Sequence, residues 1–566
     1  MSKITKEPIL QISDLCVAVE RADGRKVIDG ISLEIREGEM LCVVGESGSG
    51  KSVTSLSVMG LLPRGSLMPA GGSIRLEGEE LLGASEKRLE ALRATSMAMV
   101  FQEPVTALNP VARVGDQIDE VLKAHTPLRG AERRKRILAM LEEVHLPNVD
   151  RIYRSYPHQL SGGQRQRIMI AMALILRPRL LIADEPTTAL DVTTQKQILS
   201  LIRELRDNRG TAVLFITHDM GVVAEIADRV AVMRQGSLVE TGPLDQILRY
   251  PAEAYTRRLL SAVPSLVPRT AVGAADAEVL LQINDLGKTY STRSLLGKVR
   301  EVKAAADVTL AVRRGQTLGI VGESGSGKST VGRCAIRLIE PSEGSILVGG
   351  QDISRLRGAA LKQHRRRIQV VFQDPYRSLN PRVRVGESVI EGLINFGMAR
   401  AQALAEAAAL LEMVGLPADA VSRYPHQFSG GQRQRIAIAR ALAMKPDILI
   451  ADEAVSALDV SVQAQVLELL NDVQRRLGVG TLFITHDLRV AAQICDEIVV
   501  MKSGRIVEQG PTSEVLVDPK DPYTRSLIQA APGRHWDFPN FRPVEPAQGG
   551  GSLARVIASP PMVEAL

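Results

Sequence analysis

The sequence has few aromatic side chains and few cysteines. Phe, Trp and Tyr together make up 3% of the 566 residues, with a single tryptophan, so rings on which nucleic-acid bases could stack are scarce. The four cysteines lie far apart and form no CxxC pair, which argues against a disulfide framework or a zinc site; they are Cys16, Cys42, Cys334 and Cys495. We therefore expect a reducing compartment and no nucleic-acid partner.

Long apolar runs and a strong charge of one sign are also missing. The most apolar region, Ile168–Ala183, is cut by Arg177-Pro178-Arg179 and falls well short of a bilayer span. No N-terminal stretch resembles a signal peptide. The formal net charge of +6, from 70 basic and 64 acidic residues, points to no particular partner. We expect any role at a membrane to depend on partner proteins.

The chain does contain an internal repeat. GESGSGKS occurs at Gly45–Ser52 and Gly322–Ser329, and YPHQLSGGQRQRI at Tyr156–Ile168 matches YPHQFSGGQRQRI at Tyr424–Ile436. Two copies of one domain explain this pattern. We predict a first domain over residues 8–263, a linker over 264–278, a second domain over 279–532 and a C-terminal tail over 533–566.

Each copy predicts alternating strands and helices. The apolar strands Met40–Val44 and Thr317–Val321 run into the two glycine loops, and a helix must follow each loop. Later apolar strands, each preceded by a segment of helical period, are predicted at Leu180–Ala183, Val213–Ile216, Ile448–Ala451 and Leu482–Ile484. This alternation is typical of an α/β domain with a parallel sheet.

The repeated glycine loop has the GxxxxGK[ST] pattern of a P-loop, in which main-chain N–H groups and a helix N-terminus face a phosphate chain. Lys51 and Lys328 are predicted to reach the β- and γ-phosphates of ATP, and Ser52 and Ser329 to offer a hydroxyl to Mg²⁺. The predicted loop residues are Gly45, Glu46, Ser47, Gly48, Ser49, Gly50, Lys51 and Ser52, with Gly322, Glu323, Ser324, Gly325, Ser326, Gly327, Lys328, Ser329 and Thr330 in the second copy.

A pair of acidic residues ends a buried strand in each copy. Asp184-Glu185 follows Leu180–Ala183, and Asp452-Glu453 follows Ile448–Ala451. A P-loop enzyme needs one acid that holds magnesium and one base that orients the attacking water. We predict Asp184 and Asp452 as magnesium residues and Glu185 and Glu453 as catalytic bases.

LSGGQ at Leu160–Gln164 and FSGGQ at Phe428–Gln432 resemble the signature motif of ABC ATPases. The resemblance implies two tandem P-loop NTPase domains of ABC type, each with a mainly parallel sheet core, an antiparallel β subdomain and a helical signature subdomain. It also implies that the domains pair head to tail, each ATP lying between one P-loop and the other copy's signature. The signature residues implied to bind ATP are Ser161, Gly162, Gly163, Gln164, Ser429, Gly430, Gly431 and Gln432.

Further positions match the same family in both copies. The resemblance implies Q-loop glutamines that take part in catalysis and magnesium binding, D-loop aspartates near the nucleotide, and catalytic switch histidines; these are Gln102 and Gln373, Asp191 and Asp459, and His218 and His486. Tyr290 fits the position at which the family stacks adenine on a ring, whereas the matching residue in the first copy is Val19.

Four short motifs narrow the resemblance to importer ATPases of the dipeptide, oligopeptide, nickel and opine family, and to the twin ATPases of microcin and glutathione importers. They are ALNP and SLNP at Ala107–Pro110 and Ser378–Pro381, and AYTRRLL and PYTRSLI at Ala254–Leu260 and Pro522–Ile528. This implies import of a peptide-like solute with two transmembrane permease subunits and a periplasmic solute-binding protein, at the cytoplasmic face of the inner membrane. No iron–sulfur cluster is expected.

A ribosome-associated ATPase of the ABC-F type remains the alternative. Proteins of that type also lack membrane helices, but they usually carry NHLD at the D-loop and a long charged linker. Here the tetrapeptides are TALD, ending at Asp191, and SALD, ending at Asp459. The residues therefore favour the transport ATPase.

Overall fold

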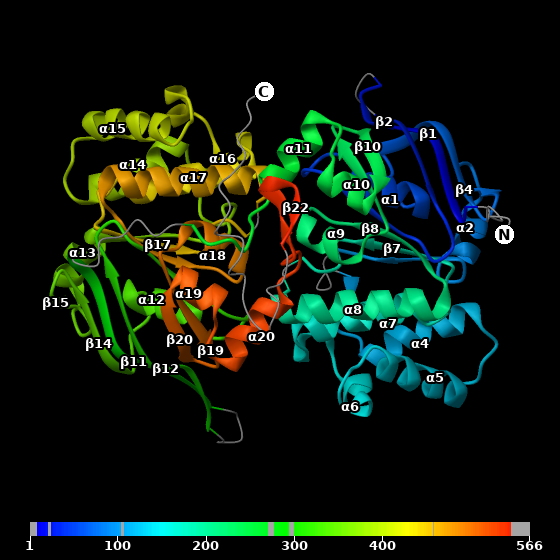
Figure 1. The fold of residues 1–566 in the computed structure, drawn as a ribbon, viewed down its shortest axis with the longest axis horizontal. Helices are drawn as coiled ribbons and strands as arrows, with labels where there is room; N and C mark the ends of the chain where they lie inside the picture. Colours follow the sequence, from blue (N-terminus) through cyan, green and yellow to red (C-terminus); the bar gives the residue numbers. More distant parts are fainter. Residues whose placement is uncertain are drawn as a thin grey trace. The chain divides into compact units, whose positions relative to one another are not determined.

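The computed structural model describes residues 8–20, 24–102, 107–188, 190–269, 277–293, 299–456 and 458–544. The chain divides into two compact units, Met1–Ser261 and Ala262–Leu566, which repeat the same order of elements (Figure 1). The predicted fold of two tandem α/β domains is confirmed. Some of the predicted segments lie outside the described residues. These are part of the linker (270–276), most of the tail (545–566), and Ala189 and Ala457 of the two D-loop motifs.

The first domain is built on two sheets. A six-stranded sheet has the order β10-β9-β3-β8-β7-β6 and is parallel except for the β9–β10 pair. A four-stranded antiparallel sheet has the order β2-β1-β4-β5. The strands are β1 (Leu10–Val19), β2 (Lys26–Ile35), β3 (Met40–Val44), β4 (Leu67–Leu76), β5 (Glu79–Glu80), β6 (Met97–Val100), β7 (Leu180–Asp184), β8 (Ala212–Ile216), β9 (Arg229–Arg234) and β10 (Ser237–Pro243).

Helices of the first domain follow the strands and form a separate helical region between β6 and β7. They are α1 (Lys51–Met59), α2 (Glu86–Leu92), α4 (Val114–His125), α5 (Gly130–Glu143), α6 (Val149–Arg154), η1 (Pro157–Gln159), α7 (Gly162–Leu174), α8 (Val192–Arg209), α9 (Met220–Ile226), α10 (Leu244–Arg249) and α11 (Ala254–Ser261). In Figure 1 the helices α4 to α7 lie together in cyan, away from the antiparallel sheet.

The second domain repeats both sheets, with the orders β16-β17-β18-β13-β19-β20 and β12-β11-β14-β15. Its strands are β11 (Val279–Arg293), β12 (Val299–Arg313), β13 (Thr317–Val321), β14 (Glu343–Val348), β15 (Gln351–Asp352), β16 (Ile368–Val371), β17 (Ile448–Asp452), β18 (Gly480–Ile484), β19 (Glu497–Lys502) and β20 (Arg505–Pro511), with β21 (Trp536–Asp537) and β22 (Arg542–Pro543) in a short terminal hairpin.

The helices of the second domain occupy the same places in the order. They are α12 (Lys328–Ala335), α13 (Gly358–Arg367), α14 (Val385–Asn395), α15 (Arg400–Met413), η2 (Ala418–Ser422), η3 (Pro425–Gln427), α16 (Gly430–Leu442), α17 (Val460–Leu477), α18 (Leu488–Ile494), α19 (Thr512–Val517), α20 (Pro522–Ala530) and η4 (Phe538–Asn540).

The apolar strands of the parallel sheets form the core. Every residue of β3, β7 and β8 is buried, as is every residue of their counterparts β13, β17 and β18. Parallel strands covered on both faces have such continuous apolar sequences. Because the carboxyl ends of neighbouring parallel strands meet at one edge, the segments that follow β3, β8 and β7 are brought close together.

The segment after the first domain is held against the second. The main-chain N–H of Arg269 donates to the carbonyl of Ala492 at 3.0 Å, and its guanidinium donates to Asn471 at 2.9 Å and to Asp496 at 2.7 Å. Asp496 is 5% exposed and also accepts from the N–H of Thr317 at 2.8 Å. Arg269 therefore ties this segment to α17, α18 and the start of β13.

We expect Arg269→Ala to destabilise the second domain, because the buried carboxylate of Asp496 loses a charged donor. A loss of about 1–3 kcal/mol is the usual scale for such a change. Calorimetry of the full chain should show the transition of the second domain lowered by a few degrees. Arg505→Ala is the control, because Arg505 and its partner Asp307 are both more than half exposed and such pairs contribute little. Equal shifts for the two variants would contradict the role of Arg269.

Candidate nucleotide-binding and catalytic site

Each phosphate loop folds around its own lysine. Lys51 Nζ donates to the carbonyls of Gly45 at 2.7 Å and Glu46 at 2.9 Å, and the loop turns at Gly45, Gly48 and Gly50, whose φ angles are 153°, 76° and 102°. In the second copy, Lys328 Nζ donates to the carbonyls of Gly322 and Glu323, both at 2.8 Å. Positive φ angles favour glycine, and here they turn the main chain around the ammonium group.

The loop is pressed against the end of a neighbouring strand. A Cβ atom added at Gly45 would collide with the main-chain carbonyl oxygen of Met233 in β9, and one added at Gly322 would collide with that of Met501 in β19. A main-chain atom cannot move aside as a flexible side chain can. The first glycine of each loop is therefore required by space as well as by φ.

A hydroxyl and a carboxylate meet at the start of the helix that follows each loop. Ser52 Oγ donates to Asp184 Oδ1 at 3.1 Å, and Ser329 Oγ donates to Asp452 Oδ1 at 2.9 Å. Burial raises the pKa of both aspartates, and the serine hydrogen bond only partly offsets this.

This donor set suits Mg²⁺, which prefers hard oxygen ligands. The second loop also leaves a buried oxygen, Ser326 Oγ, without a hydrogen-bond partner among the described residues. The residues therefore fit a magnesium ion with phosphate oxygens beside it.

The glutamate after each of these aspartates adopts a left-handed conformation. The φ angles of Glu185 and Glu453 are 47° and 50°, a region that is uncommon for residues other than glycine and is often found at functional sites. Their main-chain N–H groups still pair with the neighbouring strands, donating to Ile216 and Ile484 at 2.9 Å. The backbone thus turns the two carboxylates while keeping them attached to the sheet.

The structure brings Gln102 and His218 to Glu185. Gln102 Nε2 donates to Glu185 Oε2 at 3.0 Å, and His218 Nδ1 lies 3.1 Å from Glu185 Oε1. Burial of Glu185 acts to raise its pKa, but the hydrogen bond and charge of His218 and the charge of Lys51 outweigh it, so the pKa lies below its ordinary value. The carboxylate is therefore held ionised.

The second copy repeats this arrangement with a longer contact between histidine and glutamate. Gln373 Nε2 donates to Glu453 Oε2 at 2.7 Å, and His486 Nδ1 lies 3.5 Å from the same oxygen. Burial acts to raise the pKa of Glu453 and to lower that of His486. The interaction between the two groups outweighs burial in both, so the pKa of the glutamate falls and that of the histidine rises.

Sequence reasoning missed one contact of the first site. Thr188 Oγ1 donates to Glu185 Oε2 at 2.9 Å, whereas the matching Ser456 donates to the main-chain carbonyl of Glu453 at 3.0 Å. Thr188 opens the TALD tetrapeptide that ends at Asp191, which bears only on the ABC-F alternative. Nothing in the sequence distinguishes a hydroxyl that bonds the carboxylate from one that bonds the backbone.

Each signature motif begins a helix. Ser161 caps α7 by accepting from the N–H of Gln164 at 3.3 Å, and Ser429 caps α16 by accepting from Gln432 at 3.3 Å. In both helices the glutamine side chain accepts from the main-chain N–H of the capping serine, which completes a capping box. The glycines Gly162, Gly163, Gly430 and Gly431 form the first turns.

The signature helix lies against the helix that carries the D-loop aspartate. A Cβ atom on Gly163 would collide with Thr194, and Thr194 in turn donates through its N–H and hydroxyl to Asp191 at 2.9 and 3.0 Å. Asp191 and Asp459 are the N-caps of α8 and α17. The structure therefore links the signature and the D-loop within one domain.

Tyr290 lies on β11 and is 40% exposed, with Lys288 Nζ 5.2 Å from the centre of its ring. Val19, at the end of β1, is half-buried. A ring is thus available for stacking only on the second of these two matching strands.

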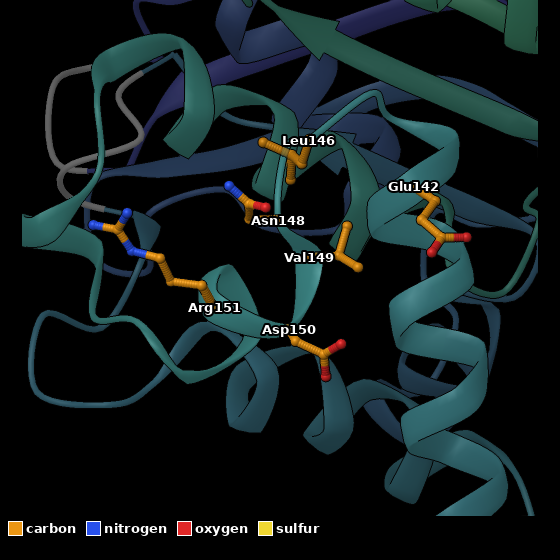
Figure 2. Close-up of a pocket in the computed structure, with 6 residues that line it drawn as sticks. All are labelled: Glu142, Leu146, Asn148, Val149, Asp150 and Arg151. Carbon is orange, nitrogen blue, oxygen red and sulfur yellow. The ribbon is translucent and has the colours of Figure 1, made fainter.

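A depression on the helical region of the first domain is shown in Figure 2. None of the residues predicted from the motifs lines it, and we assign it no role. It is lined by Glu142, Leu146, Asn148, Val149, Asp150 and Arg151.

Among the described residues, no helix has both the length and the apolar character needed to cross a bilayer.

Family models match both halves of the chain. A model described as ABC transporter matches residues 28–188 and 305–456, and a model described as Oligopeptide/dipeptide transporter, C-terminal region, matches 239–295 and 507–544. The glycine loops, the acidic pairs and the signatures all lie inside the first model, and the AYTRRLL and PYTRSLI motifs lie inside the second.

Curated relatives match along nearly the whole chain. The peptidoglycan transport ATP-binding protein YejF of Agrobacterium fabrum is 46% identical over 536 residues, covering 94% of this chain and 98% of its own length. The glutathione import ATP-binding protein GsiA of Salmonella choleraesuis is 46% identical over 564 residues, covering 94% of this chain and 90% of its own.

Each of two solved structures matches less than half of this chain. A dimeric ATP-binding cassette bound to ADP and Pi is 29% identical, covers 42% of this chain and 98% of its own, and gives a TM-score of 0.38. The cbiO1 protein of Clostridium perfringens is 27% identical, covers 45% of this chain and 95% of its own, and gives a TM-score of 0.38.

We expect Gly322→Ala to weaken ATP binding at the second phosphate loop by more than about tenfold, because the loop must move away from the carbonyl of Met501. Equilibrium binding of a fluorescent ATP analogue, with the first loop disabled by Lys51→Ala, measures this. Gly315→Ala is the matched control: Gly315 also has a positive φ, 67°, but nothing lies within 4 Å of the added Cβ atom. The control should cost about 1 kcal/mol of stability and leave binding unchanged. A parental affinity in Gly322→Ala would exclude the steric argument.

Proposed function

Since the chain belongs to the ABC transporter family as an ATP-binding subunit, we propose that it hydrolyses ATP to power import of a peptide-like solute through two separate membrane permease subunits. The observation that carries the proposal is that both copies keep a complete set of catalytic groups. Each has a loop lysine, a serine–aspartate pair and a glutamate bonded to a glutamine and a histidine. Both sites are therefore built for turnover.

In the proposed reaction the glutamates act as general bases. Glu185 and Glu453 accept a hydrogen bond from the attacking water and polarise it, while His218 and His486 hold the glutamate and the γ-phosphate in line. Lys51 and Lys328 leave the loop carbonyls to pair with the β- and γ-phosphates. The adenine stacks on Tyr290 in the second copy, whereas Val19 offers no ring in the first.

Ser52 with Asp184, and Ser329 with Asp452, would hold Mg²⁺, and Gln102 and Gln373 would complete its surroundings. When bound, the ion neutralises charge on the phosphate oxygens. The protein's own share is to keep these oxygens at the end of a buried strand, where the serine hydroxyl already meets the aspartate.

We further propose that each ATP lies between the phosphate loop of one copy and the signature of the other. The N-terminus of a helix favours an anion, and Ser161 and Ser429 with the following glycines form such an N-terminus. ATP must bind the closed arrangement much more tightly than the open one to drive transport. Ser161 to Gln164 would then serve the site of Lys328, and Ser429 to Gln432 the site of Lys51.

The proposed solute class follows from the relatives. Glutathione and the peptide stems of peptidoglycan share short peptide chains that carry free carboxylates. The permease subunits and a periplasmic solute-binding protein would select among such solutes, with this chain bound peripherally at the cytoplasmic face of the inner membrane. Both relatives are transport proteins by name, which favours this interpretation over a ribosome-associated ATPase.

Reconstitution tests the transport function. We expect the tagged chain to copurify with two membrane proteins and, in liposomes with a solute-binding protein, to support ATP-dependent uptake of labelled glutathione or of a peptidoglycan-derived peptide. Recovery with ribosomes and not with membranes, over a range of salt concentrations, would refute it.

We expect Glu185→Gln combined with Glu453→Gln to lower ATP turnover by about 10²-fold or more, the scale for loss of a general base. The amide keeps the shape of the side chain but removes the charge that polarises water. Asp184, Asp452 and both lysines remain, so ATP should stay bound. Steady-state ATPase and retained nucleotide in the assembled complex measure the two effects.

Glu204→Gln is the control for this change, since Glu204 is a half-exposed carboxylate on α8 paired with His145. It should leave turnover at the parental rate. Parental turnover in the double Glu185→Gln, Glu453→Gln protein would instead overturn the assignment of both glutamates.

A further inference from the structure

A tyrosine hydroxyl meets the first peptide of each phosphate loop. The main-chain N–H of Glu46 donates to Tyr255 Oη at 3.4 Å, and that of Glu323 donates to Tyr523 Oη at 3.2 Å. Both tyrosines lie after the last strand of their domain's six-stranded sheet, about two hundred residues from the loop. Because both copies make the same contact, we treat it as a feature of the domain fold.

The tyrosine and the loop lysine hold opposite edges of one peptide unit. The N–H of Glu46 and the carbonyl of Gly45 belong to the same planar trans peptide, so they point in opposite directions. The carbonyl accepts from Lys51 Nζ at 2.7 Å while the N–H donates to Tyr255. Rotation of this peptide would break both hydrogen bonds at once.

The second copy has the same geometry. The carbonyl of Gly322 accepts from Lys328 Nζ at 2.8 Å, and the N–H of Glu323 donates to Tyr523. The 3.2 Å distance lies within the usual range for an N–H···O hydrogen bond, whereas the 3.4 Å distance in the first copy is longer than usual. The peptide is therefore held more firmly in the second copy.

The start of each tyrosine's helix is anchored to the sheet. Glu240 in β10 accepts from the N–H groups of Ala252 and Glu253 at 2.8 and 3.2 Å, just before α11. In the second copy, Glu508 in β20 accepts from the N–H groups that precede α20, those of Lys520 and Asp521, at 2.7 and 3.2 Å. The tyrosine ring thus approaches the loop from a fixed helix.

A cation lies over each ring. The guanidinium carbon of Arg234 is 5.0 Å from the centre of the Tyr255 ring, and Lys502 Nζ is 4.6 Å from that of Tyr523. Both cations sit at the end of β9 or β19, beside the methionine whose carbonyl presses on the loop glycine. Contacts of this kind stabilise the position of an aromatic ring.

We propose that Tyr255 and Tyr523 are positioning residues for ATP: each fixes the first peptide of its phosphate loop and so sets where the lysine ammonium stands before nucleotide enters. The inference rests on the proposed ATPase function. The tyrosines act through the loop, so they affect how readily ATP binds and not the hydrolysis step. A loop whose first peptide can rotate would lose the carbonyl that holds the lysine ammonium, so the ammonium would no longer be kept in one place before the phosphates enter.

Hydrogen exchange in the nucleotide-free full chain tests the contact itself. Tyr255→Phe should speed exchange of the Glu46 amide and Tyr523→Phe that of the Glu323 amide, measured by mass spectrometry with residue-level fragmentation. Phe keeps the ring and its cation contact and removes only the hydroxyl. Tyr250→Phe is the control, because Tyr250 is 73% exposed. Unchanged exchange at both amides would overturn the proposal, whether or not the chain hydrolyses ATP.

Nucleotide affinity tests the consequence. With the other loop disabled by Lys→Ala, each Phe variant should weaken binding of a fluorescent ATP analogue by about two- to tenfold, the scale of one hydrogen bond, and more for Tyr523 than for Tyr255. With both loops intact, turnover at saturating ATP should equal that of the parental chain. The thermal midpoint of the Phe variants should stay parental, while Tyr255→Leu and Tyr523→Leu, which also lose the ring, should lower it.

Either of two results would show that the tyrosines only pack against the loop and do not position it, and would overturn the proposal. One is a parental affinity in both Phe variants; the other is an affinity loss that always accompanies an equal fall in thermal midpoint for Phe and Leu. A parental chain without ATPase activity in its assembled complex would instead refute the proposed function. The exchange measurement would still decide the contact in that case.

Discussion

The parallel pairing of β3, β8 and β7 is the constraint on which the site depends. Their carboxyl ends share one edge of the sheet, so the loop after β3, the aspartate that ends β7 and the histidine after β8 converge although they are distant in sequence. A shift of the register by one residue would exchange the two faces of a strand and separate Ser52 from Asp184. The observed pairing aligns Val43 with Ile216 and Asp184 with Ile216, which places the ends of the three strands side by side.

At this edge the structure keeps charged groups paired and buried. Lys51 is 6% exposed and Asp184 is 6% exposed, yet both make hydrogen bonds to polar atoms of the loop or the following helix. Unpaired charges in such a place would be costly. The left-handed turn at Glu185 then carries its carboxylate to Gln102 and His218, which satisfy both oxygens. These groups of the site therefore hydrogen-bond to one another or to the main chain of the loop.

The two copies of the domain build the same site from different sequences. The lysine, serine–aspartate and glutamine–glutamate contacts agree within a few tenths of an ångström. The copies differ in the contact between histidine and glutamate, which is 3.1 Å in the first copy and 3.5 Å in the second. They also differ in Val19 against Tyr290, and in the hydroxyl of Thr188, which bonds the carboxylate, against that of Ser456, which bonds the backbone. The groups proposed to bind phosphate are thus kept, while the residue proposed to stack on adenine and the hydroxyl beside the glutamate differ.

The sequence by itself determined the repeat, the αβ alternation, the glycine loops and the acidic pairs, because each depends on local pattern: glycines where φ is positive, apolar strands where both faces are covered, and charges at strand ends. It could not place Thr188 on Glu185, Tyr255 on the Glu46 amide, or Arg269 on Asp496. These contacts join residues whose types are common. They are decided by strand order and by the angle at which a helix meets the sheet, and only the tertiary structure fixes those.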